Sequence, residues 1–182
     1  LTSIEIPNSV TSIGYSAFSG CNSLTYNIYD NCKYLGNDEN PYLVLVKATN
    51  TSIQSISINP NTKIIGYDAF EGCTSLTSIE IPNSVTSIGS SAFRGCTSLT
   101  SIEIPNSVTS IGDVAFYNCI SLTSIEIPDS VKTIGTRAFE DCTGLTIYCE
   151  ALKEPSGWDS SWNTNIWNTN NCNVVWGYKK SN

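Results

Sequence analysis

The sequence contains no histidine, and this absence removes most of the common catalytic machinery. Ser-His-Asp and Cys-His arrangements need an imidazole base, so only paired carboxylates remain as common acid–base groups. Glycoside hydrolysis needs two such groups about 5 to 9.5 Å apart. In the C-terminal segment the candidates are Glu150, Glu154 and Asp159, and no spacing singles out a pair. We therefore expect no enzyme, no catalytic residue and no cofactor.

Long apolar runs and an excess of positive charge are also missing. No run approaches the ~18 residues of a membrane span, so we expect none in this chain. Residues 1–144 hold 13 acidic and 6 basic side chains, and the formal charge of the whole chain is −7. A negative surface repels phosphate backbones, which argues against nucleic acid as a partner.

What the sequence does contain is a repeat of fixed length. Residues 76–98 read LTSIEIPNSVTSIGSSAFRGCTS, and residues 99–121 read LTSIEIPNSVTSIGDVAFYNCIS, a step of 23 residues. Residues 1–23 and 122–144 repeat the phrase, and residues 53–75 are a divergent copy in the same register. Self-similarity at this period is the mark of a solenoid, in which each coil contacts its neighbours. We predict one repeat array over 1–144, interrupted by an insertion at 24–52.

The pattern within one copy predicts the path of a coil. Ile79 and Ile81 alternate with polar residues, as in a strand with one buried face, and Pro82 ends that strand. A second extended piece, 85–88, leads to Gly89, for which we expect a positive-φ corner. The apolar spacing within 90–96 predicts a turn of helix or 3₁₀ helix. Stacked coils would form an α/β, curved, right-handed leucine-rich-repeat solenoid, with a parallel sheet on one face and short helical turns on the other.

The phrase LxxIxIPxxVxxIGxxAFxxC resembles the BspA-like leucine-rich repeats over most of residues 1–144. That family occurs in surface and secreted proteins of bacteria and of some parasitic protists. The resemblance implies an extracellular or cell-surface location and adhesion to host matrix proteins, other cells or mucosal surfaces. Residues 147–178 also resemble the segment that closes such arrays. Because the chain begins at the first residue of a repeat, we expect a part of a longer protein, and we expect it to be monomeric.

The sequence of the insertion predicts a β-hairpin that projects from the stack. Strand-like runs at 32–35 and 42–47 flank a cluster of turn-forming residues. One interpretation is a decoration, because lengthening a surface loop has a small entropic cost. The other is a contact site formed by Tyr34, Tyr42 and the acidic tip, because insertions in repeat proteins often lie on a binding face.

The segment 145–182 carries all four tryptophans: Trp158, Trp162, Trp167 and Trp176. An array that ended abruptly would leave its last apolar coil and sheet edge in water, so we predict a C-terminal cap. The alternative is a carbohydrate-binding module, in which exposed indoles stack on sugar faces.

Of the eight cysteines, five recur at one repeat position and three, Cys32, Cys149 and Cys172, break the period. Cys21, Cys73, Cys96, Cys119 and Cys142 recur at one repeat position, where we predict a column of free, buried thiols rather than disulfides. Cys149 and Cys172 lie together in the predicted cap, and a disulfide between them would suit an oxidising compartment. Free buried thiols are the alternative. The chain has no CxxC pair and no histidine, so we expect no zinc site.

The candidate ligand surface is the outward side of the predicted strands. Six side chains recur there at the 23-residue step: Glu80, Glu103 and Glu126, with Ser78, Ser101 and Ser124. Neighbouring carboxylates about 4.8 Å apart would repel by roughly 1 kcal/mol per pair in water. The column could hold a calcium ion or a Lys/Arg-rich ligand. The alternative is a solvated ladder that favours solubility.

Differences between the copies indicate how such a surface would bind. Between residues 76–98 and 99–121 all five differences fall in the turn region: Ser90/Asp113, Ser91/Val114, Arg94/Tyr117, Gly95/Asn118 and Thr97/Ile120. A uniform strand face suits weak contacts summed by avidity. We therefore predict a non-catalytic protein-binding or adhesion module, with a glycan-binding module or a structural spacer as alternatives.

Overall fold

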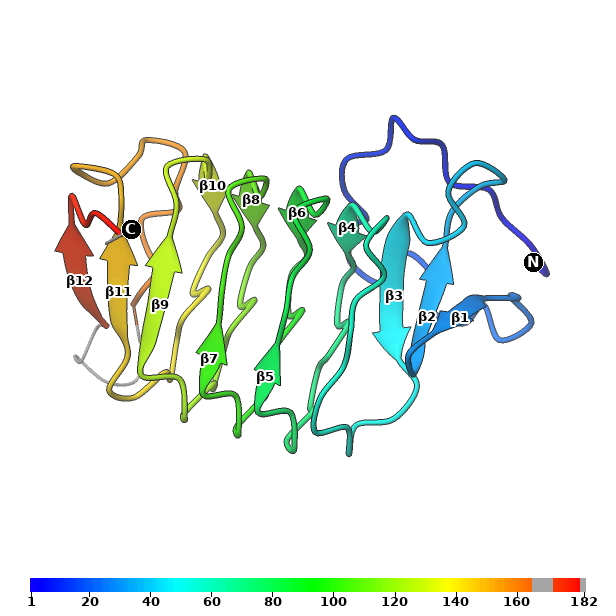
Figure 1. Ribbon diagram of the computed structural model, residues 1–182, viewed down its shortest axis with the longest axis horizontal. Coiled ribbons are helices and arrows are strands. Elements are labelled where there is room, and N and C mark those ends of the chain that lie inside the picture. Colours follow the sequence, from blue (N-terminus) through cyan, green and yellow to red (C-terminus); the bar gives the residue numbers. More distant parts are fainter. Residues whose placement is uncertain (165–171, 181–182) are drawn as a thin grey trace.

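A computed structural model describes residues 1–164 and 172–180. The chain forms an elongated stack of coils, with its N-terminus near one end and its C-terminus near the other (Figure 1). The described residues form twelve strands: β1 Asn27–Tyr29, β2 Cys32–Leu35, β3 Val44–Ala48, β4 Ile64–Ile65, β5 Ser78–Ile79, β6 Ser87–Ile88, β7 Ser101–Ile102, β8 Ser110–Ile111, β9 Ser124–Ile127, β10 Thr133–Ile134, β11 Thr146–Cys149 and β12 Asn173–Trp176. The prediction of a leucine-rich-repeat solenoid is confirmed.

Each regular coil contributes one strand to each of two walls. The first wall contains β5, β7, β9, β11 and β12, and the second contains β4, β6, β8 and β10 (Figure 1). All pairings within these walls are parallel, and partners such as Ser78 and Ser101 are one repeat apart. Every coil therefore superimposes the same residue types on those of the coil before it.

The third side of the stack consists of turns, and the prediction of helical turns there was wrong. No helix occurs within residues 1–164 and 172–180, so none in that part could cross a membrane. Ser91 and Gly95 adopt φ values of 55° and 72°, which interrupt a right-handed helix. The N–H groups of Ser91, Phe93 and Gly95 donate to carbonyls of the next coil rather than to their own. Alternate residues thus extend the inter-coil ladder along this side as well.

Columns of buried apolar side chains fill the interior. The rings of Phe70, Phe93, Phe116 and Phe139 are fully buried, and successive centroids lie 5.3, 5.2 and 5.3 Å apart with planes within 10° of parallel. Such offset-stacked rings add to the free energy gained from burying their area. The core is therefore continuous from coil to coil.

Gly89 is required for a reason other than the positive φ that we expected. Its φ is not positive, but a Cβ at this position would lie 2.7 Å from the carbonyl carbon of Gly66 in the preceding coil. The column of glycines therefore allows two backbones to approach closely where the second wall ends.

The insertion contains the predicted hairpin, but the hairpin does not project. Strand β2 pairs antiparallel with β3, and β3 pairs in parallel with β4, so the hairpin extends the second wall. Tyr34 and Leu45 face the main core and are fully buried. Val44, the first residue of a Val-Leu-Val run, faces the opposite side. A strand that is apolar on both faces is typical of a sheet covered on both sides.

The first repeat covers that outer side. Its apolar residues, among them Ile6 and Phe18, form a second cluster with Val44 and Ile64 instead of joining the main core. Ile64 occupies the position at which the next coils carry Ser87 and Ser110. An isoleucine there makes the outer face apolar, and packing of the first repeat against it removes that area from water.

The C-terminal segment closes the other end of the stack. The indole of Trp162 meets Phe139 edge to face at a centroid distance of 5.9 Å, which ends the phenylalanine column. The backbone N–H of Trp158 donates to the carbonyl of Pro155. One coil earlier, the backbone N–H of Val131 donates to the carbonyl of Pro128 in the same way. The cap is therefore a divergent coil in which tryptophans replace smaller apolar residues.

Candidate functional site

The first wall presents the predicted serine and glutamate columns on its outer surface. Ser78 lies opposite Ser101, and Ser57 lies opposite Glu80, in the parallel register that the 23-residue step predicts. Ser78, Ser101 and Ser124 are exposed, as are Glu80 and Glu103, whereas Glu126 is half-buried. The alternating isoleucines point inward and hold this flat surface in place.

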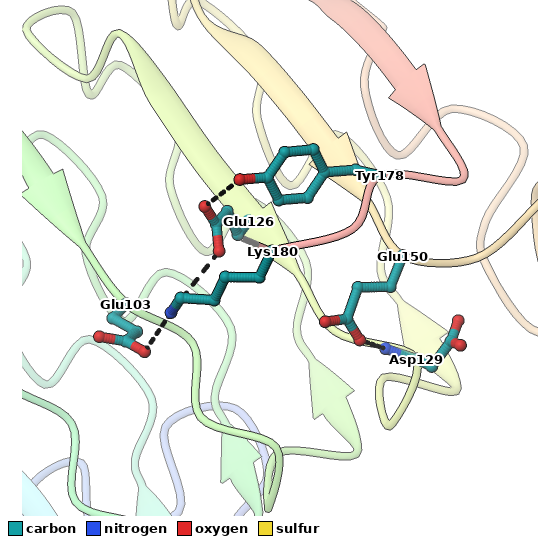
Figure 2. Close-up of polar contacts among 6 residues, drawn as sticks. All are labelled: Glu103, Glu126, Asp129, Glu150, Tyr178 and Lys180. Atoms are coloured by element: carbon teal, nitrogen blue, oxygen red, sulfur yellow. Dashed lines mark hydrogen bonds and ion pairs between the residues drawn. The ribbon is translucent and has the colours of Figure 1, made fainter. Parts of the chain in front are cut away.

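The C-terminal segment after β12 folds back across part of the glutamate column (Figure 2). The ammonium of Lys180 lies 2.8 Å from Glu103 Oε1 and 3.7 Å from Glu126 Oε2. The hydroxyl of Tyr178 donates to Glu126 Oε1 at 3.0 Å, and its ring lies 5.0 Å from that of Tyr148. Lys180 and Tyr178 thus bind the carboxylates of two of the three glutamates in the column.

These contacts reduce the repulsion between neighbouring carboxylates. The hydrogen bond to Glu103 raises the pKa of Lys180, and the hydrogen bond to Glu126 raises the pKa of the Tyr178 phenol. Each shift favours the protonated form of the group that faces the column. Glu80 forms no ion pair or side-chain hydrogen bond with the described residues, so it is the open end of the column.

The geometry around these glutamates favours a basic ligand over a calcium ion. Calcium takes six to eight oxygen ligands from several groups. No cluster of three or more ligand-type acidic, cysteine or histidine side chains gathers in the described part of the chain. Lys180 instead places one positive charge between two of the carboxylates (Figure 2).

The two tyrosines that could form a contact site in the insertion are buried to different degrees. Tyr34 is fully buried and its hydroxyl accepts a hydrogen bond from the Asn59 backbone, so the prediction that it forms a surface contact was wrong. The ring of Tyr42 is partly buried and packs 5.5 Å from that of Tyr34. Both rings therefore contribute to the packing of the hairpin against the main core.

Two of the four tryptophans are structural. Trp158 and Trp162 are 6% and 1% exposed, so neither can stack on a sugar face. The indole N–H of Trp158 donates to the Val131 carbonyl, which docks the cap on the last regular coil. Trp176 is half-buried, and Trp167 lies outside the described residues.

The three carboxylates of this segment fix local turns. Glu150 Oε2 accepts a hydrogen bond from the backbone of Asp129 (Figure 2), and Glu154 accepts one from the Trp162 indole. Asp159 accepts two from Ser161, which lower its pKa. Each of these carboxylates therefore accepts hydrogen bonds from neighbouring groups of the C-terminal segment or the last regular coil.

The predicted disulfide between Cys149 and Cys172 is not formed. Cys149 lies opposite Trp176 in the register of β11 and β12, so Cys172 is displaced by four residues. Four residues of strand span about 13 Å, well beyond the roughly 7 Å limit between bridged Cα atoms. Cys172 instead donates to the Phe139 carbonyl at 3.5 Å, as Cys142 does to Phe116 at 3.0 Å. It continues the column of repeat thiols from Cys73 to Cys142. The prediction that Cys21 belongs to this buried column was wrong, because Cys21 is only partly buried and packs in the second cluster.

Sequence reasoning missed a cleft between the first repeat and the outer face of β2 and β3. It is a cleft of about 270 Å³ whose lining includes Phe18, Tyr26, Lys33 and Lys47. The signal was present as isoleucine at position 64, where other copies carry serine or threonine, next to the apolar run of β3. An outward apolar residue on a solenoid strand indicates that another element covers that strand.

Comparison with known proteins agrees with this architecture. A cell surface leucine-rich protein from Faecalibacterium prausnitzii is 32% identical over 90% of this chain and 50% of its own, with a TM-score of 0.58. A leucine-rich repeat protein from Bacteroides ovatus is 32% identical over 86% of this chain and 34% of its own, with a TM-score of 0.51. The T. pallidum leucine-rich repeat protein is 25% identical over 74% of this chain and 63% of its own, with a TM-score of 0.61.

This chain spans between 34 and 63% of the length of those three structures. No curated relative matches it. The sequence model of the BspA type leucine rich repeat region matches residues 1–39 and 48–151 as six copies. The chain belongs to the BspA-type leucine-rich repeat family.

Proposed function

We propose that this chain is an extracellular protein-binding module that adheres to host matrix proteins or other cells through its first wall. The observation that carries the proposal is the outer surface of that wall, where serine and glutamate columns repeat over the three coils of residues 76–98, 99–121 and 122–144. The family and the fold are those of protein-binding repeat modules. The similarity to a cell surface protein from Faecalibacterium prausnitzii supports the location that we propose.

The columns favour a partner with regularly spaced basic groups. One ligand side chain can bind each coil weakly, and successive coils raise the total affinity through effective concentration. The contact of Lys180 with Glu103 and Glu126 illustrates the chemistry that such a partner would use. Glu80 provides a similar carboxylate without an internal ion pair. A partner rich in lysine or arginine on an extended segment would complement this wall.

Charge reversal on one wall tests the proposal. Glu80→Lys should weaken binding to immobilised extracellular-matrix proteins by tenfold or more, measured by biolayer interferometry. Glu71→Lys is the matched control, because Glu71 lies on the turn side and pairs with Arg94 there. Equal affinities of the two variants for every bound matrix protein would refute a role for the first wall. Thermal melts of both variants would verify that they fold.

A further inference from the structure

The cleft above β2 and β3 has the features of a small-molecule site outside the proposed adhesion surface. Its floor includes Val46 and Lys47 of β3, and its opposite side is the turn of the first repeat around Ser16 and Phe18. Its volume of about 270 Å³ is near the lower end of known ligand pockets. The cleft can therefore hold one compact group rather than a folded partner.

Two like charges meet at this cleft. Lys33 and Lys47 are direct partners across the antiparallel pair of β2 and β3, which places their Cβ atoms about 5 Å apart on one face. Opposed like charges destabilise a strand pair. Neither ammonium forms an ion pair within residues 1–164 and 172–180. The chain has nine basic and sixteen acidic residues, and this pairing places two of the nine basic residues side by side.

One carboxylate, that of Asp68, lines the same cleft. Burial raises its pKa, as does the nearby charge of Glu71, whereas Lys47 lowers it. Tyr67 and Ser91 of the neighbouring turns also lower this pKa, whereas Asp68 Oδ1 is buried and has no hydrogen-bond partner among the described residues. A single partly buried carboxylate leaves one of the two lysine charges without compensation.

Aromatic rings provide the second recognition element. Lys33 lies 5.1 Å from the ring centre of Tyr26, and Phe18 lines the cleft because it has left the phenylalanine column. Ser16 and Ser19, which carry hydroxyl groups, also line the cleft. Charge, ring faces and hydroxyls together match a small polar ring that carries an acidic group.

We propose that this cleft binds an acidic sugar unit, with its carboxylate or sulfate between Lys33 and Lys47 and its ring against Phe18 and Tyr26. The acidic group neutralises the opposed lysines, and the serine hydroxyls bond the ring hydroxyls. The unit can be a free sugar acid or the terminal residue of a glycan, since both present the same chemistry.

The test is a titration of the ¹⁵N-labelled chain with glucuronate and, in parallel, with glucose. Glucuronate should shift the amide signals of Gly14, Lys33, Lys47 and Gly66, and glucose should not, because the two sugars differ in the acid group. Lys33→Gln and Lys47→Gln should each weaken glucuronate binding roughly fivefold. Lys153→Gln, an exposed lysine of the cap, is the charge-matched control and should leave it unchanged.

Two results would overturn the proposal. One is an absence of glucuronate shifts in this cleft, and the other is an equal loss of affinity in Lys153→Gln, which would indicate an effect of net charge. A glycan array separates the two sources, because acid-terminated glycans should be retained only if the cleft accepts a linked residue. Loss of matrix binding in Glu80→Lys would leave these shifts intact, so the two proposals fail independently.

Discussion

Replacing Phe93 by alanine tests whether the stacked phenylalanines are the main source of stability. The side chain is fully buried, and its ring centre lies 5.3 Å from that of Phe70 and 5.2 Å from that of Phe116. A buried Phe→Ala change costs about 3 to 5 kcal/mol through lost transfer energy and the remaining cavity. Because two ring stacks of about 0.5 to 1.5 kcal/mol each are lost as well, we expect the upper end of this range.

The chain supplies a matched control at the same repeat position. Phe18 corresponds to Phe93 in the first repeat, but it is only partly buried and packs in the second cluster beside the cleft. Phe18→Ala should therefore cost less than half as much, because fewer neighbours close around the cavity. Urea unfolding followed by tryptophan fluorescence measures both, since Trp162 ends the column. Equal midpoint shifts for the two variants would refute the reasoning that full burial within the stacked column makes Phe93 the more stabilising ring.

Three further predictions concern the backbone and the thiols. Val114 has φ 48°, which is strained for a β-branched residue, so Val114→Asn should stabilise the fold by about 1 kcal/mol in thermal unfolding; a lower melting temperature would contradict this. Gly89→Ala should destabilise by roughly 1 to 3 kcal/mol in urea, whereas Gly14→Ala, whose added Cβ meets no atom within 4 Å, should be near neutral; similar effects would show that inter-coil approach is irrelevant. Native alkylation near neutral pH, followed by peptide mapping, should label the partly exposed Cys21 first, because burial raises the pKa of Cys96 to about 12; faster labelling of Cys96 would disprove its burial.

The coil architecture could be predicted from the sequence because its determinants are periodic. Apolar residues at fixed places in a 23-residue unit must superimpose when the coils stack, so the buried columns follow directly. The conformation of the turns could not be predicted in this way. Apolar residues at 92, 93 and 96 fit one turn of helix, but Ser91 and Gly95 have positive φ. The inter-coil hydrogen bonds of this side, which no local pattern reveals, determine the outcome.

The candidate surface could be predicted because it is also periodic, but the C-terminal residues that contact it could not. Glu80, Glu103 and Glu126 share a repeat position, so their alignment follows from the period. Tyr178 and Lys180 have no counterpart in the repeats, and they reach the column only because β12 pairs with β11 and the chain then turns back. Sequence distance gave no indication of a contact between residues 103 and 180.

The insertion separates two kinds of surface on one solenoid. Where the period is intact, each coil presents the same polar pattern, and a partner gains affinity only by binding several coils. Where the hairpin interrupts the period, Val44 and Ile64 make the second wall apolar on its outer side, and the first repeat packs there. That packing leaves Phe18 outside the phenylalanine column and beside Lys33, which forms a concave surface between the first repeat and the hairpin. This concave surface suits a single small ligand, whereas the uniform wall suits an extended one. The same 23-residue unit therefore supports both, because the hairpin changes the neighbours of one copy and leaves the others stacked.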